Sequence, residues 1–283
     1  MSNLKTSLYI VATPIGNLGD ISQRAISTLQ SVDLIAAEDT RHSSKLLQHL
    51  AIETPCVAFH EHNERDKTAW LIKRLLEGES IALISDAGTP LLSDPGYHLV
   101  KAAHEHGIPV VPIPGASALL AALVGAGLPT DRFIFEGFLP SKKVARTKYL
   151  SRLEKETATL VFYEAPHRIL DCLQDMLEVF GPEREAVLAR ELSKTFETIR
   201  RASLADLVEW VASDSNQQRG EIVLVVAGHK PLTGEGLDPD AERILAVLLK
   251  HLPVKQAAGI AAEITGEKKN RLYEVALTLN DSD

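Results

Sequence analysis

Cysteine is scarce in this 283-residue sequence, and that narrows the classes of protein it can belong to. Cys56 and Cys172 are the only cysteines and no CxxC pair occurs, which argues against a zinc site and a dithiol redox motif. No apolar run is long enough to cross a membrane, and the first one, at 8–12, is too short for a signal peptide. We therefore expect a cytoplasmic protein with two buried thiols and no membrane partner.

Positive charge and aromatic side chains are also in short supply. The formal net charge is −8, so any contact with nucleic acid must depend on a local basic patch. Aromatic residues make up 5% of the sequence and hydrophobic residues 45%, which predicts an aliphatic core. The glycine signatures of dinucleotide-binding proteins and P-loop nucleotidases are absent. The His-Glu-His triplets at 60–62 and 104–106 have no further ligands at helical spacing, so we expect no metal site.

Apolar runs that alternate with helical patterns predict an α/β fold with mostly parallel sheets covered on both faces. The runs that predict strands lie at 8–12, 32–38, 56–60, 81–85, 109–113, 132–138, 158–164, 185–191, 197–203 and 221–228. Stretches with helical periodicity lie between them, for example at 68–78, 116–127, 141–156, 167–180 and 203–213. The pair Asp94-Pro95 predicts a helix start, with Asp94 as N-cap and Pro95 in the first turn.

The order of these patterns predicts three parts. We place two α/β domains at 1–116 and 117–229, and a small helical extension at 237–283 after a linker at 230–240. The extension contains only helical patterns, and Gly266 predicts the end of its middle helix.

Loops rich in glycine, proline and polar residues follow the strands of the first domain. They are ATPIGN (12–17), AEDTRHS (37–43), FHEHNE (59–64), SDAGTPLLSDPG (85–96) and PIPGASA (112–118). In open α/β sheets, ligands bind at the carboxyl ends of the strands, and glycine lets the backbone approach them closely. Five such loops in a row favour a binding site over five ordinary turns.

Charged residues follow the strands of the second domain as well. FYEAPHR (162–168) and RELSKTFE (190–197) place Glu191 directly at the end of a buried strand, which favours a site residue. The segment at 141–155 holds six basic residues against Glu154 alone. It predicts either a phosphate-binding surface or a solvated helix face, and KKNR (268–271) is a shorter candidate of the same kind.

Six motifs closely resemble the ribosomal RNA small subunit methyltransferase I family of the tetrapyrrole methylase superfamily. They are VATPIGNLGDIS, AAEDTRHS, SDAGTPLLSDPG, PIPGASA, FYEAPHR and RELSKTFET, and the resemblance covers roughly residues 8–228. It implies a homodimer of two-domain chains with S-adenosylmethionine in the cleft between the domains. It also implies 2'-O-methylation of a cytidine ribose in the decoding centre of 16S rRNA, on the 30S subunit.

The resemblance assigns cofactor-binding positions residue by residue. The tetrapyrrole enzymes have Asp where this chain has Thr89, so Asp86, three residues earlier, is the candidate for that polar role. The positions implied are Pro14, Asp86, Ala87, Gly88, Thr89, Leu92, Ser117, Ala118, Tyr163 and Leu192.

A ribose hydroxyl needs a group that accepts its proton. The candidate acids are Glu191, Asp39 and Glu164, with His42, His60, His62 and His167 as alternatives. The cations suited to RNA are Arg41, Lys142, Lys143, Arg146, Arg168 and Lys194. Two other functions stay open: a tetrapyrrole-type small-molecule methyltransferase of the same superfamily, and a nucleic-acid-binding protein whose last helices form a helix-turn-helix.

Overall fold

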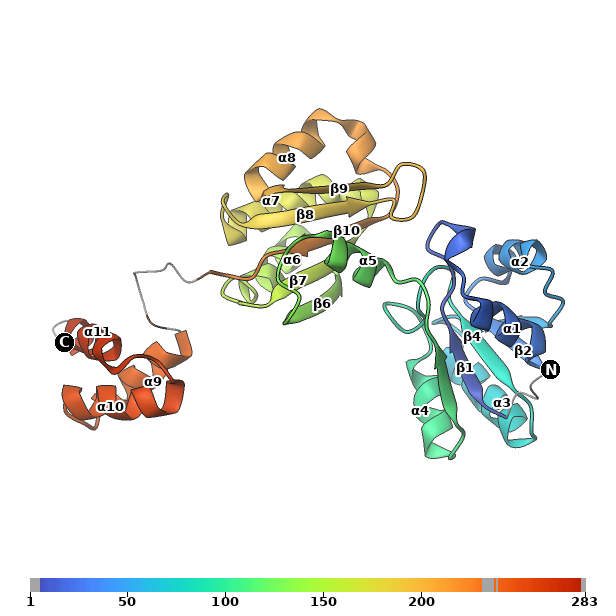
Figure 1. Ribbon diagram of the computed structural model, residues 1–283, viewed down its shortest axis with the longest axis horizontal. Coiled ribbons are helices and arrows are strands. Elements are labelled where there is room, and N and C mark those ends of the chain that lie inside the picture. The colour runs from blue at the N-terminus through green and yellow to red at the C-terminus, as the bar shows by residue number, and fades with distance from the viewer. Residues whose placement is uncertain (1–5, 231–236, 238, 281–283) are drawn as a thin grey trace. The chain divides into compact units, whose positions relative to one another are not determined.

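The computed structural model describes residues 6–230, 237 and 239–280, and the chain forms two compact units at 1–228 and 229–283. Within the described residues, the larger unit contains two five-stranded sheets with helices between the strands, and the smaller unit contains helices alone (Figure 1). The predicted α/β class and the helical extension are thereby confirmed.

The first sheet is parallel throughout, with the strand order β3-β2-β4-β1-β5. Leu8 at the start of β1 pairs with Ile81 on one side and Val110 on the other, so the carboxyl ends of these strands lie at one edge. The bounds are β1 Leu8–Val11, β2 Leu34–Ala37, β3 Cys56–Ala58, β4 Ile81–Ile84 and β5 Val110–Ile113.

Alternate side chains of this sheet face two layers of helices. Leu8 and Leu83 belong to a core with α3 and α4, whereas Val11 and Ile84 belong to a core with α1 and α2. Both faces are therefore apolar, which explains the nearly unbroken hydrophobic runs of β1 and β4. The helices are α1 Gln23–Ser31, α2 Thr40–His49, α3 Glu64–Leu76 and α4 Tyr97–Glu105, with a short 3-10 turn at Leu18–Asp20.

The second sheet is mixed, with the order β6-β7-β10-β8-β9. Strands β6 and β7 are parallel, but β10 is antiparallel to both of its neighbours and β9 is antiparallel to β8. The connection at 191–197 contains no helix, and a connection that short returns the chain antiparallel. The mostly parallel prediction missed this hairpin. The bounds are β6 Phe133–Phe138, β7 Thr159–Glu164, β8 Glu185–Arg190, β9 Thr198–Ser203 and β10 Ile222–Val226.

The second sheet is also covered on both faces. One core contains Phe162 and Leu188 with residues of α7 and α8, and the other contains Val161 and Val187 with residues of α5. Ile15, from the loop after β1, joins the α5 core. The helices are α5 Ala118–Gly125, α6 Lys143–Ser151, α7 Ile169–Phe180 and α8 Leu204–Ser213, with 3-10 turns at Pro166–Arg168 and Ser215–Gln218.

The smaller unit consists of α9 Pro239–Leu249, α10 Val254–Thr265 and α11 Lys269–Asn280. Leu245, Ala258 and Leu272 contribute to its apolar core. Gly266 ends α10 in the left-handed conformation, as predicted. Of the predicted linker at 230–240, residues 231–236 and 238 lie outside the described residues, and Pro239 opens α9. None of the helices in the described ranges has the length and apolar character needed to cross a bilayer.

Candidate functional site

A cavity of about 410 Å³ lies in the larger unit, and residues of both sheets line it. This volume is within the usual range of small-molecule sites. Of the ten residues that the family resemblance assigns to the cofactor, the lining includes Asp86, Ala87, Gly88, Thr89, Leu92, Ala118, Tyr163 and Leu192. The other two, Pro14 and Ser117, are next in sequence to the lining residues Ile15 and Ala118.

Hydrogen bonds fasten the loops of the first sheet to one another. Thr13 and Gly88 exchange backbone hydrogen bonds of 2.8 and 3.0 Å, which join the loop after β1 to the loop after β4. The Thr89 hydroxyl donates to the Ala116 carbonyl at 3.0 Å and so joins the loop after β5. Gly88 has a φ of 81°, which favours glycine and brings its backbone to the cavity wall.

Asp86 braces the loop that follows β2. Its Oδ1 accepts a hydrogen bond from the Asp39 N–H at 3.1 Å, and its own N–H lies 3.5 Å from Glu38 Oε2. Because Asp86 also lines the cavity, one residue both supports a neighbouring loop and faces the site.

Asp94 does not cap a helix, so that prediction was wrong. Helix α4 begins at Tyr97, and the buried Glu64 of α3 accepts hydrogen bonds from the N–H groups of Gly96 and His98 at 3.1 Å each. Glu64 thus performs the capping role, and Asp94 lines the cavity instead. Asp-Pro is a local start signal, but here a contact across the fold satisfies the helix end.

Three carboxylates therefore line the cavity from the first sheet: Glu38, Asp86 and Asp94. Burial raises the pKa of Asp94 to about 6, and the charges of Glu38 and Asp86 add to the shift. Burial also raises the pKa of Glu38, with further repulsion from Asp86. In the described part of the chain, no Lys or Arg forms an ion pair with any of the three. The site is consequently rich in uncompensated negative charge.

Two loops at the cavity have backbone conformations that are unusual for residues other than glycine. Leu91 and Ser93 have φ values of 73° and 71°, and Glu191 and Ser193, after β8, have 51° and 68°. Such conformations cost free energy and persist where the surrounding contacts impose them, often at ligand sites. Leu92 and Leu192, each between two such residues, are thereby presented to the cavity.

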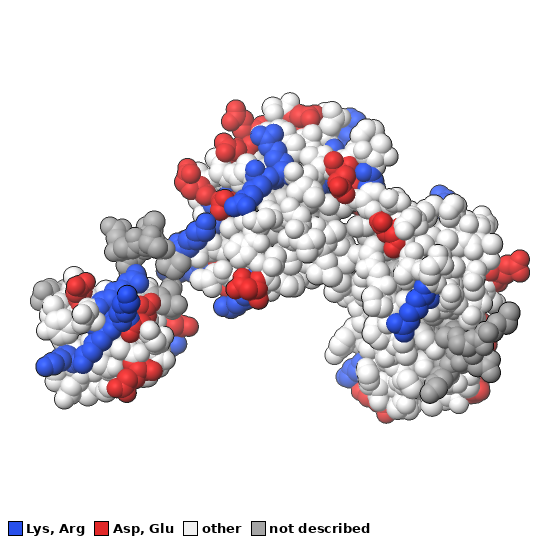
Figure 2. Space-filling model, viewed as in Figure 1, with Lys and Arg blue, Asp and Glu red and all other residues white. Residues whose placement is uncertain are grey.

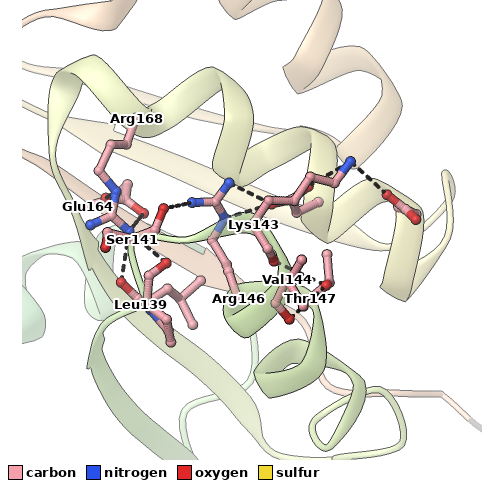
Figure 3. Close-up of polar contacts among 11 residues, drawn as sticks. Leu139, Ser141, Lys143, Val144, Arg146, Thr147, Glu164 and Arg168 are labelled. Atoms are coloured by element: carbon pink, nitrogen blue, oxygen red, sulfur yellow. Dashed lines mark hydrogen bonds and ion pairs between the residues drawn. The ribbon is translucent and has the colours of Figure 1, made fainter.

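The second sheet contributes aromatic and charged residues. Tyr163 lies between Phe135 and Phe138, with ring centroids 4.9 and 5.6 Å away in edge-to-face arrangements. Burial raises the pKa of Tyr163. Glu164 is fully buried and pairs with Arg168 at 3.2 Å (Figure 3). This wall is apolar around an acid that already has a counterion.

The three acids predicted as proton acceptors differ in their access to the cavity. Glu164 lines it but is paired with Arg168. Glu191 pairs with Lys194 at 2.8 Å and does not line it. Asp39 caps α2 and pairs with Arg41 at the surface.

Sequence reasoning missed Glu38 and Asp94 as site residues. Glu38 directly precedes the candidate Asp39 in the motif AEDTRHS, and the alternation of side chains along β2 was the available signal. Asp94 was assigned to a helix cap on its local sequence alone.

The predicted RNA-binding residues differ in their exposure and in their ion pairs. Arg146 is a correction: it is buried and bound to Asp175 through two contacts of 2.6 Å, so it holds the fold and cannot meet RNA (Figure 3). Lys143 is exposed, and ion pairs with Glu178 and Asp175 raise its pKa. Lys142 is exposed at the start of α6.

The remaining three cations have acidic partners. Arg41 is exposed and pairs with Asp39, whereas Arg168 and Lys194 are mostly buried beside Glu164 and Glu191. On the face drawn in Figure 2, most of the surface is white, with short blue runs and small red groups on it.

The histidines and cysteines form no recognisable centre. Among the described residues, no cluster of His, Cys, Asp and Glu is able to hold a metal ion. Cys172 is buried and Cys56 half-buried, and burial raises the pKa of the Cys56 thiol to about 11. His60 and His62 lie with ring centroids 6.0 Å apart in the loop after β3, outside the cavity lining.

The family model for Tetrapyrrole (Corrin/Porphyrin) Methylases matches residues 7–208. The larger unit, with its two sheets and its cavity between strand-end loops, therefore belongs to the tetrapyrrole methylase class. A solved structure of uroporphyrin-III C-methyltransferase from Thermus thermophilus, complexed with S-adenosylhomocysteine, superposes with a TM-score of 0.53 at 18% identity. That match covers 78% of this chain and 97% of the other, and it shows a shared fold.

Within this class, the chain belongs to the ribosomal RNA small subunit methyltransferase I family. It is 62% identical over 272 residues to the member from Pseudomonas aeruginosa, covering 96% of both chains. It is 56% identical over 275 residues to the member from Escherichia coli O157:H7, covering 97% of this chain and 96% of the other. The model for the RsmI C-terminal HTH domain matches residues 235–280.

Proposed function

We propose that this chain transfers a methyl group from S-adenosylmethionine to the 2'-hydroxyl of a cytidine ribose in the decoding centre of 16S rRNA, on the 30S subunit. Membership of the family supports ribosomal RNA as the acceptor. The observation that carries the chemistry is Asp94, a half-buried carboxylate that lines the cavity beside the loop at 86–92. We further propose that the protein works in the cytoplasm as a homodimer.

The cavity residues fit S-adenosylmethionine, which carries positive charge on its sulfonium and its amino group. Glu38, Asp86 and Asp94 favour a cationic ligand, because no Lys or Arg of the described residues forms an ion pair with them. The Ser117 hydroxyl is buried and has no hydrogen-bond partner within the described structure, and Ser117 directly precedes the lining residue Ala118. When bound, the cofactor supplies an electrophilic methyl group.

Asp94 is the residue best suited to accept the proton of the ribose hydroxyl. With a pKa of about 6 it is ionised at neutral pH and is more basic than an ordinary aspartate. The neighbouring Ser85 side chain lowers the pKa of Asp94, but burial and the nearby carboxylates outweigh it. A proton taken by Asp94 also relieves the repulsion from Glu38 and Asp86, which favours the transfer.

The other walls orient the reactants and exclude water. Leu92 and Leu192 present apolar surface to the cavity from opposite sheets. A methyl transfer depends on the alignment of donor and acceptor, so rigid walls contribute directly to the rate. The hydrogen-bonded loops at Thr13, Gly88 and Thr89 supply that rigidity.

A parallel acceptor assay tests the proposal. Purified protein and labelled S-adenosylmethionine are incubated with 30S subunits, free 16S rRNA and a uroporphyrinogen-type acceptor. We expect label in the 30S subunit, at the 2'-oxygen of one cytidine after nuclease digestion and mass spectrometry. Label in the tetrapyrrole alone would overturn the proposal in favour of a small-molecule methyltransferase.

A further inference from the structure

Phe138 stands out because it is a large apolar side chain that is 56% exposed and lines the cavity. We infer that Phe138 is a stacking platform for a base of the RNA substrate, next to the ribose that is methylated. The inference rests on the proposed function, since it names how the RNA is held at the same site.

An irregularity in β6 aims this side chain at the cavity. The pairing of β6 with β7 shifts between Phe135 and Gly137, so that Phe138 rather than Gly137 lies opposite Tyr163. In a regular strand, side chains alternate between faces, and the extra residue places Phe138 on the same face as Phe135. Gly137 has a φ of 63°, which permits the bulge.

The bulge also touches the loop that lines the opposite wall. A methyl group added at Gly137 would lie 3.3 Å from the Ser93 hydroxyl, so β6 and the loop at 85–96 meet closely here. Ser93 has a positive φ and also lines the cavity. Phe138 is therefore placed beside the loop that carries Asp94.

Two arginines, the buried Arg146 and the mostly buried Arg168, hold the residues that follow Phe138. Arg168 donates a hydrogen bond to the Leu139 carbonyl at 2.7 Å, and Arg146 donates one to the Ser141 carbonyl at 3.1 Å (Figure 3). Phe138 is thus an exposed ring on a fixed backbone. A pre-positioned aromatic loses little conformational entropy when it binds, which is the property a stacking platform needs.

The charges nearby favour a nucleotide over an apolar partner. Helix α6 starts five residues after Phe138, and Lys142 at its N-cap and Lys148 within it are exposed. Aromatic rings that stack on bases, with cations for the phosphates, are the usual means of holding unpaired RNA. A ribose whose hydroxyl reaches Asp94 brings its base to the same cavity, where the apolar ring of Phe138 is available.

Substitutions at Phe138 test this in the full-length protein. Phe138→Ala should raise KM for 30S subunits, or lower kcat/KM, between about five-fold and about a hundred-fold, the range expected for one stacked base. Phe138→Tyr keeps the ring and should stay within about two-fold of the unsubstituted protein, whereas Phe138→Leu keeps apolar bulk and should resemble Phe138→Ala. The dissociation constant for S-adenosylmethionine, measured by calorimetry, should change less than about two-fold in all three.

Phe133→Ala is the matched control, because Phe133 is an exposed phenylalanine in the same strand that does not line the cavity. It should leave KM for 30S subunits unchanged. Phe138→Ala with an unchanged KM would overturn the inference while leaving the proposed function intact. An equal loss of S-adenosylmethionine affinity would assign the ring to the cofactor, and dissociation in sedimentation velocity would assign it to a second copy of the chain. Either result would also overturn it.

The unsubstituted protein separates this test from that of the proposed function. If it places no label in 30S subunits or in 16S rRNA, the proposed function fails and the stacking role falls with it.

Discussion

The two walls of the cavity carry carboxylates in opposite electrostatic states. Glu38 and Asp94, from the first sheet, have raised pKa values and form no ion pair with Lys or Arg among the described residues. Glu164, from the second sheet, is equally close to the cavity but is neutralised by Arg168. We therefore expect the same chemical group to serve chemistry on one wall and structure on the other, with its neighbours deciding which.

Glu191 is the clearest example of a carboxylate that is held by partners and serves the structure. Burial alone would raise its pKa, but hydrogen bonds from Lys194 and from the Glu221 N–H outweigh burial and lower it. An acid with a lowered pKa is a poor proton acceptor. We therefore expect Glu191 to fix the loop after β8, where its own φ is 51°, and to have no direct part in the reaction.

The largest expected effect comes from removing the uncompensated acid. Asp94→Asn keeps the size and the hydrogen-bonding oxygen but cannot accept the proton, so kcat should fall by about 10²- to 10⁴-fold. Steady-state methyl transfer to 30S subunits measures this. Asp39→Asn is the control, since asparagine still caps α2, and its kcat should stay within a few-fold. Similar kcat values in the two variants would contradict the proposed role of Asp94 as the proton acceptor.

Loss of a buried ion pair beside the second sheet should lower the stability of the fold. Arg146→Met leaves the buried Asp175 carboxylate without its close partner, which should lower the free energy of unfolding by about 3–5 kcal/mol. Urea denaturation followed by circular dichroism measures the change. Arg41→Met breaks an exposed pair with Asp39 and should leave the unfolding midpoint unchanged. A small loss at Arg146 would show that Lys143, 3.5 Å from Asp175, replaces it.

Stability should respond to pH at Asp94 in the direction opposite to that of a salt-bridged acid. Its pKa is raised from 3.8 to about 6, so the folded state holds a proton that the unfolded state has lost between these values. This contribution to stability is present below about pH 4 and is lost as the pH rises through about 6. Asp94→Asn should therefore raise the melting temperature at pH 7.5, with a smaller gain at pH 5. A lower melting temperature at pH 7.5 would show that the carboxylate is stabilised by contacts.

The smallest effect is expected from the exposed lysines at α6. The double substitution of Lys142 and Lys148 by glutamate should raise KM for 30S subunits a few-fold. It should also reduce the slope of log KM against log salt concentration by about two, which corresponds to the loss of two phosphate contacts. Lys101→Glu, on α4 beside Glu105, is the control and should change neither quantity. An unchanged salt dependence in the double variant would show that α6 faces solvent alone.

The sequence motifs predicted loops that line the cavity, because each of these loops is local in sequence. SDAGTPLLSDPG and ATPIGN each follow one strand, and parallel pairing brings their strands together. The role of Asp94 was not predictable in the same way. Its place in the cavity depends on Glu64, which lies in another helix and takes over the cap. A contact between elements leaves no trace in the spacing of residues along the chain.

The same limit explains the error at Arg146, but it does not explain the missed hairpin. Arg146 and Leu150 share one face of α6, and the periodicity places both inward, but only the structure supplies Asp175 of α7 as the partner. The antiparallel return of β9 could have been predicted, since the stretch at 191–197 has no helical pattern and is too short for a crossover.

The pH dependence of kcat for methyl transfer to 30S subunits, measured for the unsubstituted protein, Asp94→Asn and Glu164→Gln, tests the contrast between the walls most directly. We predict that the unsubstituted protein loses activity as the pH falls below about 6, because Asp94 becomes protonated. Glu164→Gln should keep that inflection, and Asp94→Asn should be slow without it. An inflection near pH 6 that persists in Asp94→Asn at an undiminished rate would contradict the assignment of the proton acceptor.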